Sequence, residues 1–334
     1  MKNIFSTATC VRRSPLNPLL SADRMPFDAS LVFNAGVAKY QGRYVMLFRN
    51  DYGATEADFL ASGKRGVPFK GTNIGLAESA DGIHWEVREK PVWEVHDDEI
   101  LRVYDPRLTV IDGKAVICFA MDTRHGLRGG VAVTEDFDRF EIKSLSVPDN
   151  RNMVLFPEKI GGRYFRLERP MPVYSRNGAP EQFDLWCSVS PDLVFWGDSR
   201  LVLGAETVPF CDAKIGPAAP PVKTSRGWLT TFHAVKYADG DLASWHLNWR
   251  KIYYAGMMLL ALDDPSKVIG ICDRPLLVPE TPYEKVGFRG EVIFPGGMIL
   301  EESGEVKIYY GAADTVECLA TADVGDLLAL VGAK

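Results

Sequence analysis

Cysteines are few in this sequence, and long apolar runs are absent. The six cysteines are scattered over 334 residues without a Cys-x-x-Cys pair, and most of them lie inside apolar runs. Such thiols behave as small buried hydrophobic groups, so neither a disulfide framework nor a zinc site is indicated. No run approaches the roughly 20 apolar residues of a membrane-spanning helix, and residues 1–13 lack the apolar core of a signal peptide. We therefore expect a cytoplasmic protein that does not interact with membranes.

Excess positive charge is also lacking. The formal net charge is −6 at pH 7, because 38 Lys and Arg stand against 44 Asp and Glu. Surfaces that bind nucleic acids or anionic membranes are usually basic, so no nucleic-acid partner is expected. Walker and Rossmann glycine motifs are absent, which argues against a bound nucleotide. No spacing of metal-ligating residues recurs, and we expect no metal and no organic cofactor.

What the sequence does contain is one hairpin pattern in five copies. Each copy has an apolar run, a short turn with glycine and a second strand-forming run, which together are a strong hairpin signal. Long helical periodicity is missing, which argues against an α/β barrel. The five pairs of runs are Leu31–Tyr40 with Arg43–Arg49, Leu108–Ile111 with Lys114–Ala120, Met153–Ile160 with Arg163–Arg169, Ala218–Lys223 with Trp228–His233, and Val292–Leu300 with Glu305–Tyr310.

A second motif follows the hairpins in the same order. It has the form Ser/Thr-x-Asp-x-x-x-aromatic, and its Ser, Thr and Asp side chains favour turns held by side-chain-to-backbone hydrogen bonds. It begins at Ser79, Thr134 and Ser190, and at Thr321 with Leu327 in the aromatic position. Each unit should therefore contain a hairpin, a third strand, an Asp-containing turn and a short fourth strand.

Four-stranded units that repeat at intervals of roughly 50–75 residues predict the blades of a propeller. We predict an all-β fold, a five-bladed β-propeller that forms one domain over residues 1–334, with the active site in its central channel. The innermost strand of each blade borders that channel, so polar residues at equivalent positions should converge on one pocket. The starts of the first hairpin strands carry Asn34, Tyr104, Asp105, Asn150–Asn152 and Lys214, and the ends of the second strands carry Arg49–Asp51, Asp122, Arg169, His233 and Asp314.

Two kinds of chemistry are present in this set. One is a carboxylate, Asp105, which Pro106 should hold extended at the entrance of its strand. The other is a basic group made up of Arg65, Arg151, Arg169, Lys214 and His233. Arginine suits bidentate binding of phosphate or carboxylate, and lysine adds a point charge. An acidic protein that collects cations in its channel is expected to bind a small anion there, such as inorganic phosphate.

The sequence resembles glycoside hydrolase family 130, the inverting β-mannoside phosphorylases and related β-mannosidases with five-bladed propellers. The matching segments run through nearly the whole chain: Phe33-Asn34-Ala35-Gly36, Leu47-Phe48-Arg49-Asn50, Tyr104-Asp105-Pro106-Arg107, Phe156-Pro157-Glu158-Lys159-Ile160, Arg169-Pro170, Lys214-Ile215-Gly216, Phe232-His233 and Tyr309-Tyr310-Gly311-Ala312-Ala313-Asp314. The resemblance implies that Asp105 is the catalytic acid. It also implies phosphate binding by Arg65, Arg151, Arg169, Lys214, His233 and Tyr254, and mannosyl binding by Asn34, Arg49, Tyr104 and Asp314.

One assignment stays open between two neighbouring residues. The stretch 237–251 is insertion-like, so Tyr253 is an alternative to Tyr254. Several aromatic residues in predicted loops are candidates for sugar stacking, although packing is the commoner role of such residues. They are Tyr52, Trp93, Trp245, Trp249 and Phe288.

The reaction that the resemblance implies is chemically consistent with this set of residues. An inverting hydrolase needs a general acid and a general base, whereas phosphate is already an anionic nucleophile and needs only a cationic binding site. The expected reaction converts a β-mannoside (β-1,4 or β-1,2 linked) and phosphate into α-mannose 1-phosphate and a shortened acceptor. Asp105 would have to stay protonated near neutral pH, which calls for burial.

Three alternatives remain beside this reading. A β-mannosidase of the same family would cleave without phosphate. A non-catalytic glycan-binding propeller would leave the acid beside the basic group unexplained. An arabinanase or fructosidase propeller would carry two or three axial carboxylates and no cationic cradle. A homo-oligomer is compatible with all of these readings.

Overall fold

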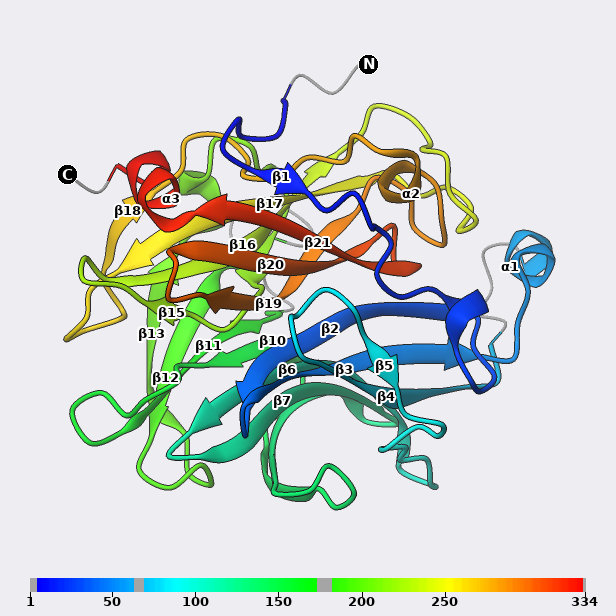
Figure 1. Cartoon of the computed structure of the whole chain (residues 1–334), viewed down its shortest axis with the longest axis horizontal. Helices are drawn as coiled ribbons and strands as arrows, with labels where there is room; N and C mark the ends of the chain where they lie inside the picture. Colours follow the sequence, from blue (N-terminus) through cyan, green and yellow to red (C-terminus); the bar gives the residue numbers. More distant parts are fainter. Residues whose placement is uncertain (1–4, 63–68, 173–181, 333–334) are drawn as a thin grey trace.

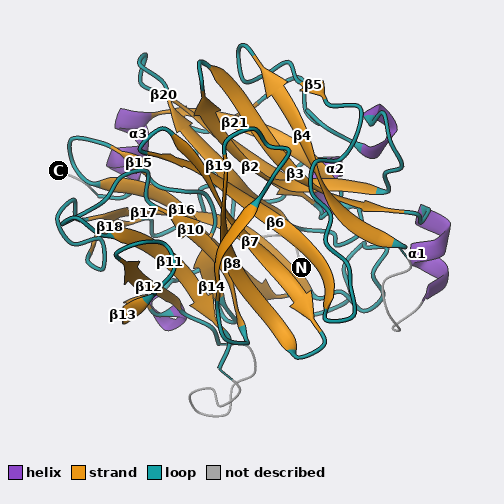
Figure 2. Ribbon diagram, turned by 90° about the horizontal axis from the view of Figure 1, so that it is seen from below, coloured by secondary structure: helices purple, strands orange, loops and turns teal. Residues whose placement is uncertain are grey.

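Five antiparallel sheets form the five blades of a β-propeller (Figure 1). The computed structural model describes residues 5–62, 69–172 and 182–332. Helices are short and lie at the periphery of the strands (Figure 2). They are the α-helices α1 (Glu56–Ser62), α2 (Pro282–Lys285) and α3 (Val324–Leu330), and the 3₁₀ turns η1 (Ala22–Arg24) and η3 (Ala205–Thr207). The predicted fold class is therefore confirmed.

In blades 1 to 4 the strands follow the chain from the inner to the outer edge, and all five predicted hairpins are present. Blade 1 is β2 (Leu31–Tyr40), β3 (Arg43–Tyr52), β4 (Gly71–Ser79) and β5 (Glu86–Val87). Blade 2 is β6 (Ile100–Ile111), β7 (Lys114–Thr123), β8 (Gly126–Thr134) and β9 (Glu141–Leu145). Blade 3 is β10 (Asn150–Leu155), β11 (Tyr164–Pro170), β12 (Leu185–Ser190) and β13 (Gly197–Leu203). Blade 4 is β14 (Ile215–Pro217) with β15 (Val222–Lys223), then β16 (Trp228–Tyr237), β17 (Lys251–Leu260) and β18 (Val268–Ile271).

Blade 5 is closed by the opposite end of the chain. Its strands are β19 (Ile293–Leu300), β20 (Glu305–Ala312) and β21 (Val316–Asp323), and the outer strand is β1 (Arg12–Arg13), which pairs with β21. Figure 1 shows the blue β1 beside the red β21. The first and last parts of the described chain are thus joined by backbone hydrogen bonds.

The Ser/Thr-x-Asp motif is followed by the predicted fourth strand in the first three blades but not in the fifth. In the first copy Ser79 accepts the backbone N–H of Gly82, and Asp81 accepts the N–H groups of Ile83 and His84. In the copy at Thr321, Asp323 likewise accepts the backbone N–H groups of Gly325 and Asp326. The prediction of a short fourth strand after this copy is wrong, because Asp323 leads into α3 and the outer position of the blade is occupied by β1.

The innermost strands of three blades share a bulge that brings a polar side chain to the channel. Asn34 in β2, Asp105 in β6 and Asn152 in β10 have φ values of 55°, 53° and 56°, and each lies where the strand register shifts by one residue. An extra residue in a bulge changes the direction of its side chain. Asp105 therefore lies inside β6 in a left-handed conformation, and the expectation that Pro106 keeps it extended at the strand entrance is wrong.

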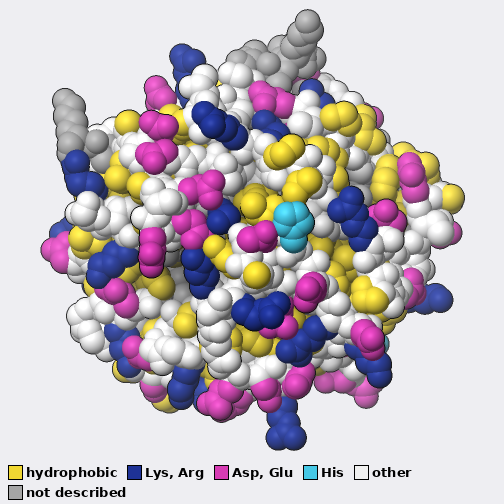
Figure 3. Space-filling view, in the orientation of Figure 1, with side chains coloured by type: hydrophobic (Ala, Val, Ile, Leu, Met, Phe, Trp, Pro, Cys, Tyr) yellow, Lys and Arg dark blue, Asp and Glu magenta, His cyan; other side chains and the backbone are white. Residues whose placement is uncertain are grey.

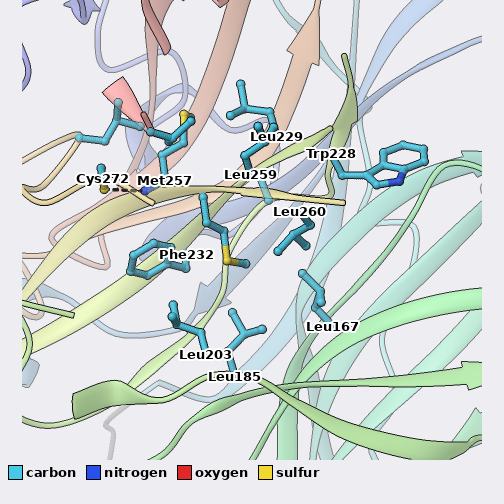
Figure 4. Close-up of a cluster of buried hydrophobic side chains, with 14 of the residues drawn as sticks. Leu167, Leu185, Leu203, Trp228, Leu229, Phe232, Met257, Leu259, Leu260 and Cys272 are labelled. Atoms are coloured by element: carbon cyan, nitrogen blue, oxygen red, sulfur yellow. Dashed lines mark hydrogen bonds between the residues drawn. The ribbon is translucent and has the colours of Figure 1, made fainter. Parts of the chain in front are cut away.

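Apolar side chains fill the spaces between neighbouring blades. The largest cluster joins blades 3, 4 and 5, and Figure 4 shows Leu167 and Leu185 of blade 3 facing Phe232 and Leu260 of blade 4. In three blades a phenylalanine ring covers a glycine on the adjacent strand, and the paired residues are Phe48 and Gly75, Phe119 and Gly130, and Phe232 and Gly256. A Cβ atom on any of these glycines would come within 2.3 Å of the ring. This packing fixes the strands from which the channel residues project.

The surface carries charges of both signs. On the face shown in Figure 3, acidic and basic side chains are interspersed, and no extended basic patch is visible. No helix within the described ranges has the length and apolar character needed to cross a membrane.

Arg13 in β1 attaches the N-terminal strand to α2, the helix that precedes blade 5. Its guanidinium binds Glu284 through Nε at 2.7 Å and Nη2 at 3.1 Å, and Glu284 also accepts the Tyr310 hydroxyl at 2.9 Å. The Glu284 side chain is 0% exposed. A buried carboxylate that loses its cationic partner is strongly destabilising.

The substitution Arg13→Met should therefore lower the free energy of unfolding by about 3–5 kcal/mol. Arg12, on the same strand, is exposed and provides the matched control. Arg12→Met should change stability by no more than about 0.5 kcal/mol. Urea denaturation followed by tryptophan fluorescence measures both values. Equal losses in the two variants would contradict the assignment of Arg13 as the attachment.

Candidate active site

One pocket in the central channel receives side chains from all five blades. It is lined by Asn34, Arg49, Asp105, Arg151, Asn152, Arg169, Trp249, Tyr253, Arg289, Val292, Phe294 and Asp314. The cavity among these residues is only about 50 Å³, because paired charged side chains occupy much of the channel. A larger open groove of about 830 Å³ lies between residues 6–12 and α3. The charged side chains of that groove, such as Arg12 and Asp273, are exposed. The channel pocket instead brings together buried charged side chains, among them Arg49, Arg169 and Asp314, and is the candidate active site.

Asp105 is held by neighbours from blade 1. Its Oδ1 accepts a hydrogen bond from the Asn34 side-chain amide at 3.0 Å and lies 3.4 Å from Arg49 Nη1. The Asp105 side chain is 11% exposed. The left-handed bulges at both residues make this contact, since each one directs a side chain into the channel. Asp105 and Asn34 are thus brought together, as the sequence predicted.

The electrostatic surroundings of Asp105 differ from the expectation. Burial acts to raise the pKa of its carboxyl group, but Arg49, Arg107, Asn34 and Arg151 together hold that pKa below its ordinary value. In the free protein Asp105 is therefore ionised near neutral pH. Burial does favour the protonated acid, as expected from the sequence, but in the free site the surrounding cations outweigh burial.

Arg49 is itself fixed by a second carboxylate, Asp51. Asp51 accepts hydrogen bonds from Arg49 Nε at 3.0 Å and Nη2 at 2.7 Å, and another from the hydroxyl of Thr72 at 2.6 Å. The guanidinium carbon lies 4.7 Å from the Phe33 ring centre and 4.8 Å from that of Tyr104. Stacked and bidentate arginines have one preferred geometry. Asp51 thus leaves Arg49 Nη1 free to face Asp105.

Tyr104 lies beside this arrangement and does not line the pocket directly. Its hydroxyl donates to Asp122 at 2.7 Å, and Arg151 Nη1 approaches the same oxygen at 3.5 Å. Burial raises the pKa of Tyr104 to about 12, so the hydroxyl is protonated. Tyr104 connects the Arg49 stack to Arg151 on the next blade.

The basic residues form a layer on the blade 3 and blade 4 side. Arg151 and Arg169 line the pocket, and Arg169 Nη1 lies 2.9 Å from His233 Nε2 behind it. Burial, followed by the nearby cations Arg169 and Lys214, lowers the pKa of His233 well below its ordinary value. The imidazole is therefore neutral. Lys214 is buried in the same layer, 5.8 Å from the Phe183 ring centre.

Gly216 explains how this layer packs so closely. A Cβ atom at Gly216 would lie 2.5 Å from the His233 ring and 3.0 Å from Arg169 Cδ. Any larger residue would displace both side chains. The short segment Lys214-Ile215-Gly216 thus combines a cation with the space that its neighbours need.

One predicted residue lies in the apolar core and not at the pocket. Tyr254 packs against Phe5 and Phe210, with ring centres 5.7 and 6.4 Å away, and belongs to the apolar core. Its neighbour Tyr253 lines the pocket and stacks on His233 at 6.0 Å. Successive residues of a strand face opposite sides, so we correct the assignment from Tyr254 to Tyr253. Arg65 lies outside the described residues.

Asp314 approaches the pocket from blade 5, as predicted, but with partners that the sequence did not indicate. Arg289 Nη1 lies 3.0 Å from Asp314 Oδ2, and its guanidinium carbon is 5.3 Å from the Trp249 ring centre. Burial raises the pKa of Asp314, and Arg289 opposes that rise. Trp249 was a candidate stacking residue, whereas no motif distinguished Arg289. Asn152 was among the residues expected at the starts of the inner hairpins, and it lines the pocket at the position equivalent to Asn34 and Asp105.

Two further buried charged residues, Arg107 and Glu317, contact the bulge that carries Asn34. Arg107 donates to the carbonyl oxygens of Ala218 at 2.8 Å and Asn34 at 3.1 Å, which ties three blades together. Glu317 is 0% exposed and accepts the backbone N–H of Ala35 at 3.1 Å. Burial raises the pKa of Glu317 to about 8. These contacts hold the bulge that carries Asn34.

Metal ligands do not gather in this part of the protein. Within the described ranges, no group of three or more His, Cys, Asp or Glu residues has an arrangement suited to a metal ion.

The corrected assignment of the pocket tyrosine, Tyr253 in place of Tyr254, can be tested by measuring anion binding. Tyr253 lies among Arg169, Arg151 and Arg289, whose charges act on its hydroxyl. A hydrogen bond to a charged group contributes about 1.5–3 kcal/mol, so Tyr253→Phe should weaken the binding of inorganic phosphate about 10-fold or more. Tyr254→Phe should leave it unchanged. Isothermal titration calorimetry with phosphate measures both, and a larger effect at Tyr254 would refute the correction.

Comparison with known proteins identifies the family. The family model described as β-1,4-mannooligosaccharide phosphorylase, that of glycoside hydrolase family 130, matches residues 12–333. A β-1,2-mannobiose phosphorylase of Listeria innocua is 32% identical over 244 residues, which make up 72% of this chain and 64% of that protein. A β-1,4-mannooligosaccharide phosphorylase of Ruminococcus albus is 31% identical over 330 residues, or 95% of this chain and 89% of that protein.

The solved structures agree with this match. The Listeria innocua β-1,2-mannobiose phosphorylase in complex with β-1,2-mannobiose superposes with a TM-score of 0.81 at 26% identity, over 97% of this chain and 99% of that chain. The sequence match covers nearly all of the described propeller, including every blade that contributes to the pocket. The chain therefore belongs to glycoside hydrolase family 130.

Proposed function

We propose that this protein catalyses the phosphorolysis of β-mannosides, β-1,4 or β-1,2 linked, with inversion at the anomeric carbon. The products would be α-mannose 1-phosphate and a shortened acceptor. The observation that carries the proposal is the layer of arginines, Arg151 and Arg169, that shares one pocket with the carboxylate of Asp105. The names of the relatives, which are mannoside phosphorylases of both linkage types, support the same reaction.

The phosphate would be bound on the blade 3 and blade 4 side. Arg151 and Arg169 would provide the direct contacts, with Tyr253 beside them. Lys214 and neutral His233 lie behind Arg169 and would orient it. Guanidinium groups bind phosphate through two parallel hydrogen bonds, and the electrostatic attraction between the two groups is stronger where water is excluded. Inorganic phosphate is the co-substrate in this scheme, and no cofactor is required.

The mannosyl unit would lie between the phosphate and Asp105. Asn34, Arg49 and Asp314 line this part of the pocket, and Tyr104 supports it from behind. A phosphate oxygen attacks the anomeric carbon, the glycosidic C–O bond breaks, and the departing oxygen receives the proton of Asp105, directly or through a sugar hydroxyl. Attack on the face opposite the leaving group inverts the anomeric configuration.

Asp105 is ionised in the free site, and this scheme requires that it takes up a proton when phosphate binds. Arg49, Arg107 and Arg151 lower the pKa of Asp105 in the absence of other anions. A bound phosphate adds negative charge that offsets these cations and so raises the pKa of the acid. Asp105 would thus be protonated when phosphate, the nucleophile, is bound.

Hydrolysis is the second candidate, because Asp314 is a further carboxylate that lines the same pocket. A β-mannosidase would use such a group to activate water. The ion pair of Asp314 with Arg289 at 3.0 Å disfavours that role, since a cationic partner weakens a general base. A non-catalytic glycan-binding propeller has no use for a buried acid next to cations.

Cleavage of β-1,4- and β-1,2-mannobiose with and without phosphate separates these functions. We expect release of α-mannose 1-phosphate that depends on phosphate, and no release of free mannose beyond one sugar per disaccharide. Asp105→Asn should lower kcat by about 10²- to 10⁴-fold, the usual contribution of a general acid. Cleavage at an equal rate without phosphate would overturn phosphorolysis, and unchanged kcat in Asp105→Asn would exclude it as the acid.

The proton linkage predicts that phosphate binding takes up protons. Because the pKa of Asp105 is lowered in the free site and raised by bound phosphate, affinity for phosphate should increase as the pH falls between the two values. Calorimetry in buffers with different ionisation enthalpies measures the protons taken up. Asp105→Asn, which retains the shape but cannot titrate, is the control for protons bound by phosphate itself. Equal uptake in both proteins would contradict the linkage.

A further inference from the structure

We propose that Arg289 is a positioning residue for Asp314 and sets the strength with which the pocket binds the mannosyl unit. The inference rests on the proposed role of Asp314 in sugar binding. Arg289 Nη1 lies 3.0 Å from Asp314 Oδ2, and the Arg289 backbone N–H donates to the carbonyl of Ala313, the neighbour of Asp314. Two contacts thus join Arg289 to the turn that carries the carboxylate.

The guanidinium of Arg289 has little freedom to move away. It lies over two aromatic rings, with its carbon 5.0 Å from the Phe288 ring centre and 5.3 Å from that of Trp249. An arginine that stacks on aromatic faces and pairs with a carboxylate is fixed in orientation. Arg289 can therefore hold the Asp314 oxygens in one geometry toward the pocket.

Trp249 is fixed in turn by its own partners. Its indole N–H donates to the carbonyl of Gly290 at 2.8 Å, and its ring stacks on Tyr253 at 6.0 Å with an angle of 16° between the ring planes. Tyr253 stacks on His233, which contacts Arg169. One continuous row of stacked groups therefore runs along the pocket wall from the basic layer to Arg289.

The segment that supplies Trp249 is packed tightly against the segment that supplies Arg289. Backbone N–H groups of Trp245 and His246 donate to the carbonyls of Gly287 and Phe288 at 2.8 and 2.9 Å. A Cβ atom at Gly290 would lie 1.9 Å from the Ala243 carbonyl oxygen. Figure 1 shows this connection as the yellow-green loop next to α2. The insertion-like stretch between β16 and β17 thus acts on the pocket through Arg289.

The charge of Arg289 adds to the geometric effect. Three charged groups act on Asp314: Arg289 from the same blade, Arg49 from β3 and Asp105 from β6. Burial raises the pKa of Asp314, and Arg289 is the first of the cations that oppose the rise. Removal of Arg289 should raise that pKa further. An ionised carboxylate is the better acceptor for sugar hydroxyls, so sugar binding should then be lost at a higher pH.

Steady-state kinetics of Arg289→Met with β-mannobiose and phosphate test the inference. We expect kcat/KM for the mannoside to fall about 10- to 100-fold, the loss of a charged hydrogen bond, mainly through KM. The acid limb of its pH profile should move to higher pH, and KM for phosphate should stay within about twofold. Arg289→Lys, which keeps the charge without the planar stack, should recover part of the loss.

The matched control is Arg250→Met. Arg250 follows Trp249 directly but pairs with Asp241 at the exposed edge of the loop. It should leave both KM values and the pH profile unchanged. If Arg289→Met retains the wild-type KM for mannoside and the wild-type pH profile, the positioning role is refuted. An equal rise in both KM values would also refute it, because that result would mean a general distortion of the pocket.

Failure of the proposed function would be visible in a different comparison. Wild-type protein that cleaves mannobiose equally with and without phosphate would refute phosphorolysis, yet the effect of Arg289→Met on KM for mannobiose would still decide the role of Arg289. Wild-type protein that does not cleave mannobiose would refute both, since Asp314 would then have no mannosyl unit to bind.

Discussion

Neutralisation of buried charge governs the centre of this propeller. Isolated charges in a protein interior are costly, and each needs a partner of opposite sign or several hydrogen bonds. The channel meets this need within and between blades: Arg49 pairs with Asp51 on its own strand and with Asp105 on blade 2, and Arg289 pairs with Asp314 within blade 5. The contact between Arg49 and Asp105 and the hydrogen bonds of Arg107 to Ala218 and Asn34 join neighbouring parts of the ring, so they also help to fix the positions of the blades around the axis.

In the proposed reaction, the same balance prepares the site for phosphate. Among the described residues that line the pocket, four are arginines and two are carboxylates, so the lining is basic inside a protein with a net charge of −6. These cations are already in place, so a small anion can bind among them without the reorientation of surrounding dipoles that water would require. The acid, its hydrogen-bond donor Asn34 and the cations are then prearranged, and the substrate only completes the charge balance.

Several features could be recognised from residues alone because they are local and repeated. The five glycine-containing hairpins and three of the Asp-containing turns depend on contacts within a few residues, so their sequence signals are strong. The convergence of Asn34, Arg49, Asp105, Arg151 and Arg169 followed from the symmetry of the repeats. The outer strand of blade 5 did not, because it comes from residues 12–13, more than 300 positions from its partner.

The sequence by itself determined the propeller, the axial position of the pocket and the types of residue that line it, since these depend on periodicity and strand alternation. Only the tertiary structure decided the direction of individual side chains and the charge state of the acid. Tyr253 rather than Tyr254 faces the pocket because of the register between β16 and β17. Asp105 is ionised in the free site because cations from blades 1, 2 and 3 surround it. Arg289 reaches Asp314 through loop packing that no periodic pattern encodes. In each case the cause is a contact between residues distant in the chain, and such contacts have no local signal.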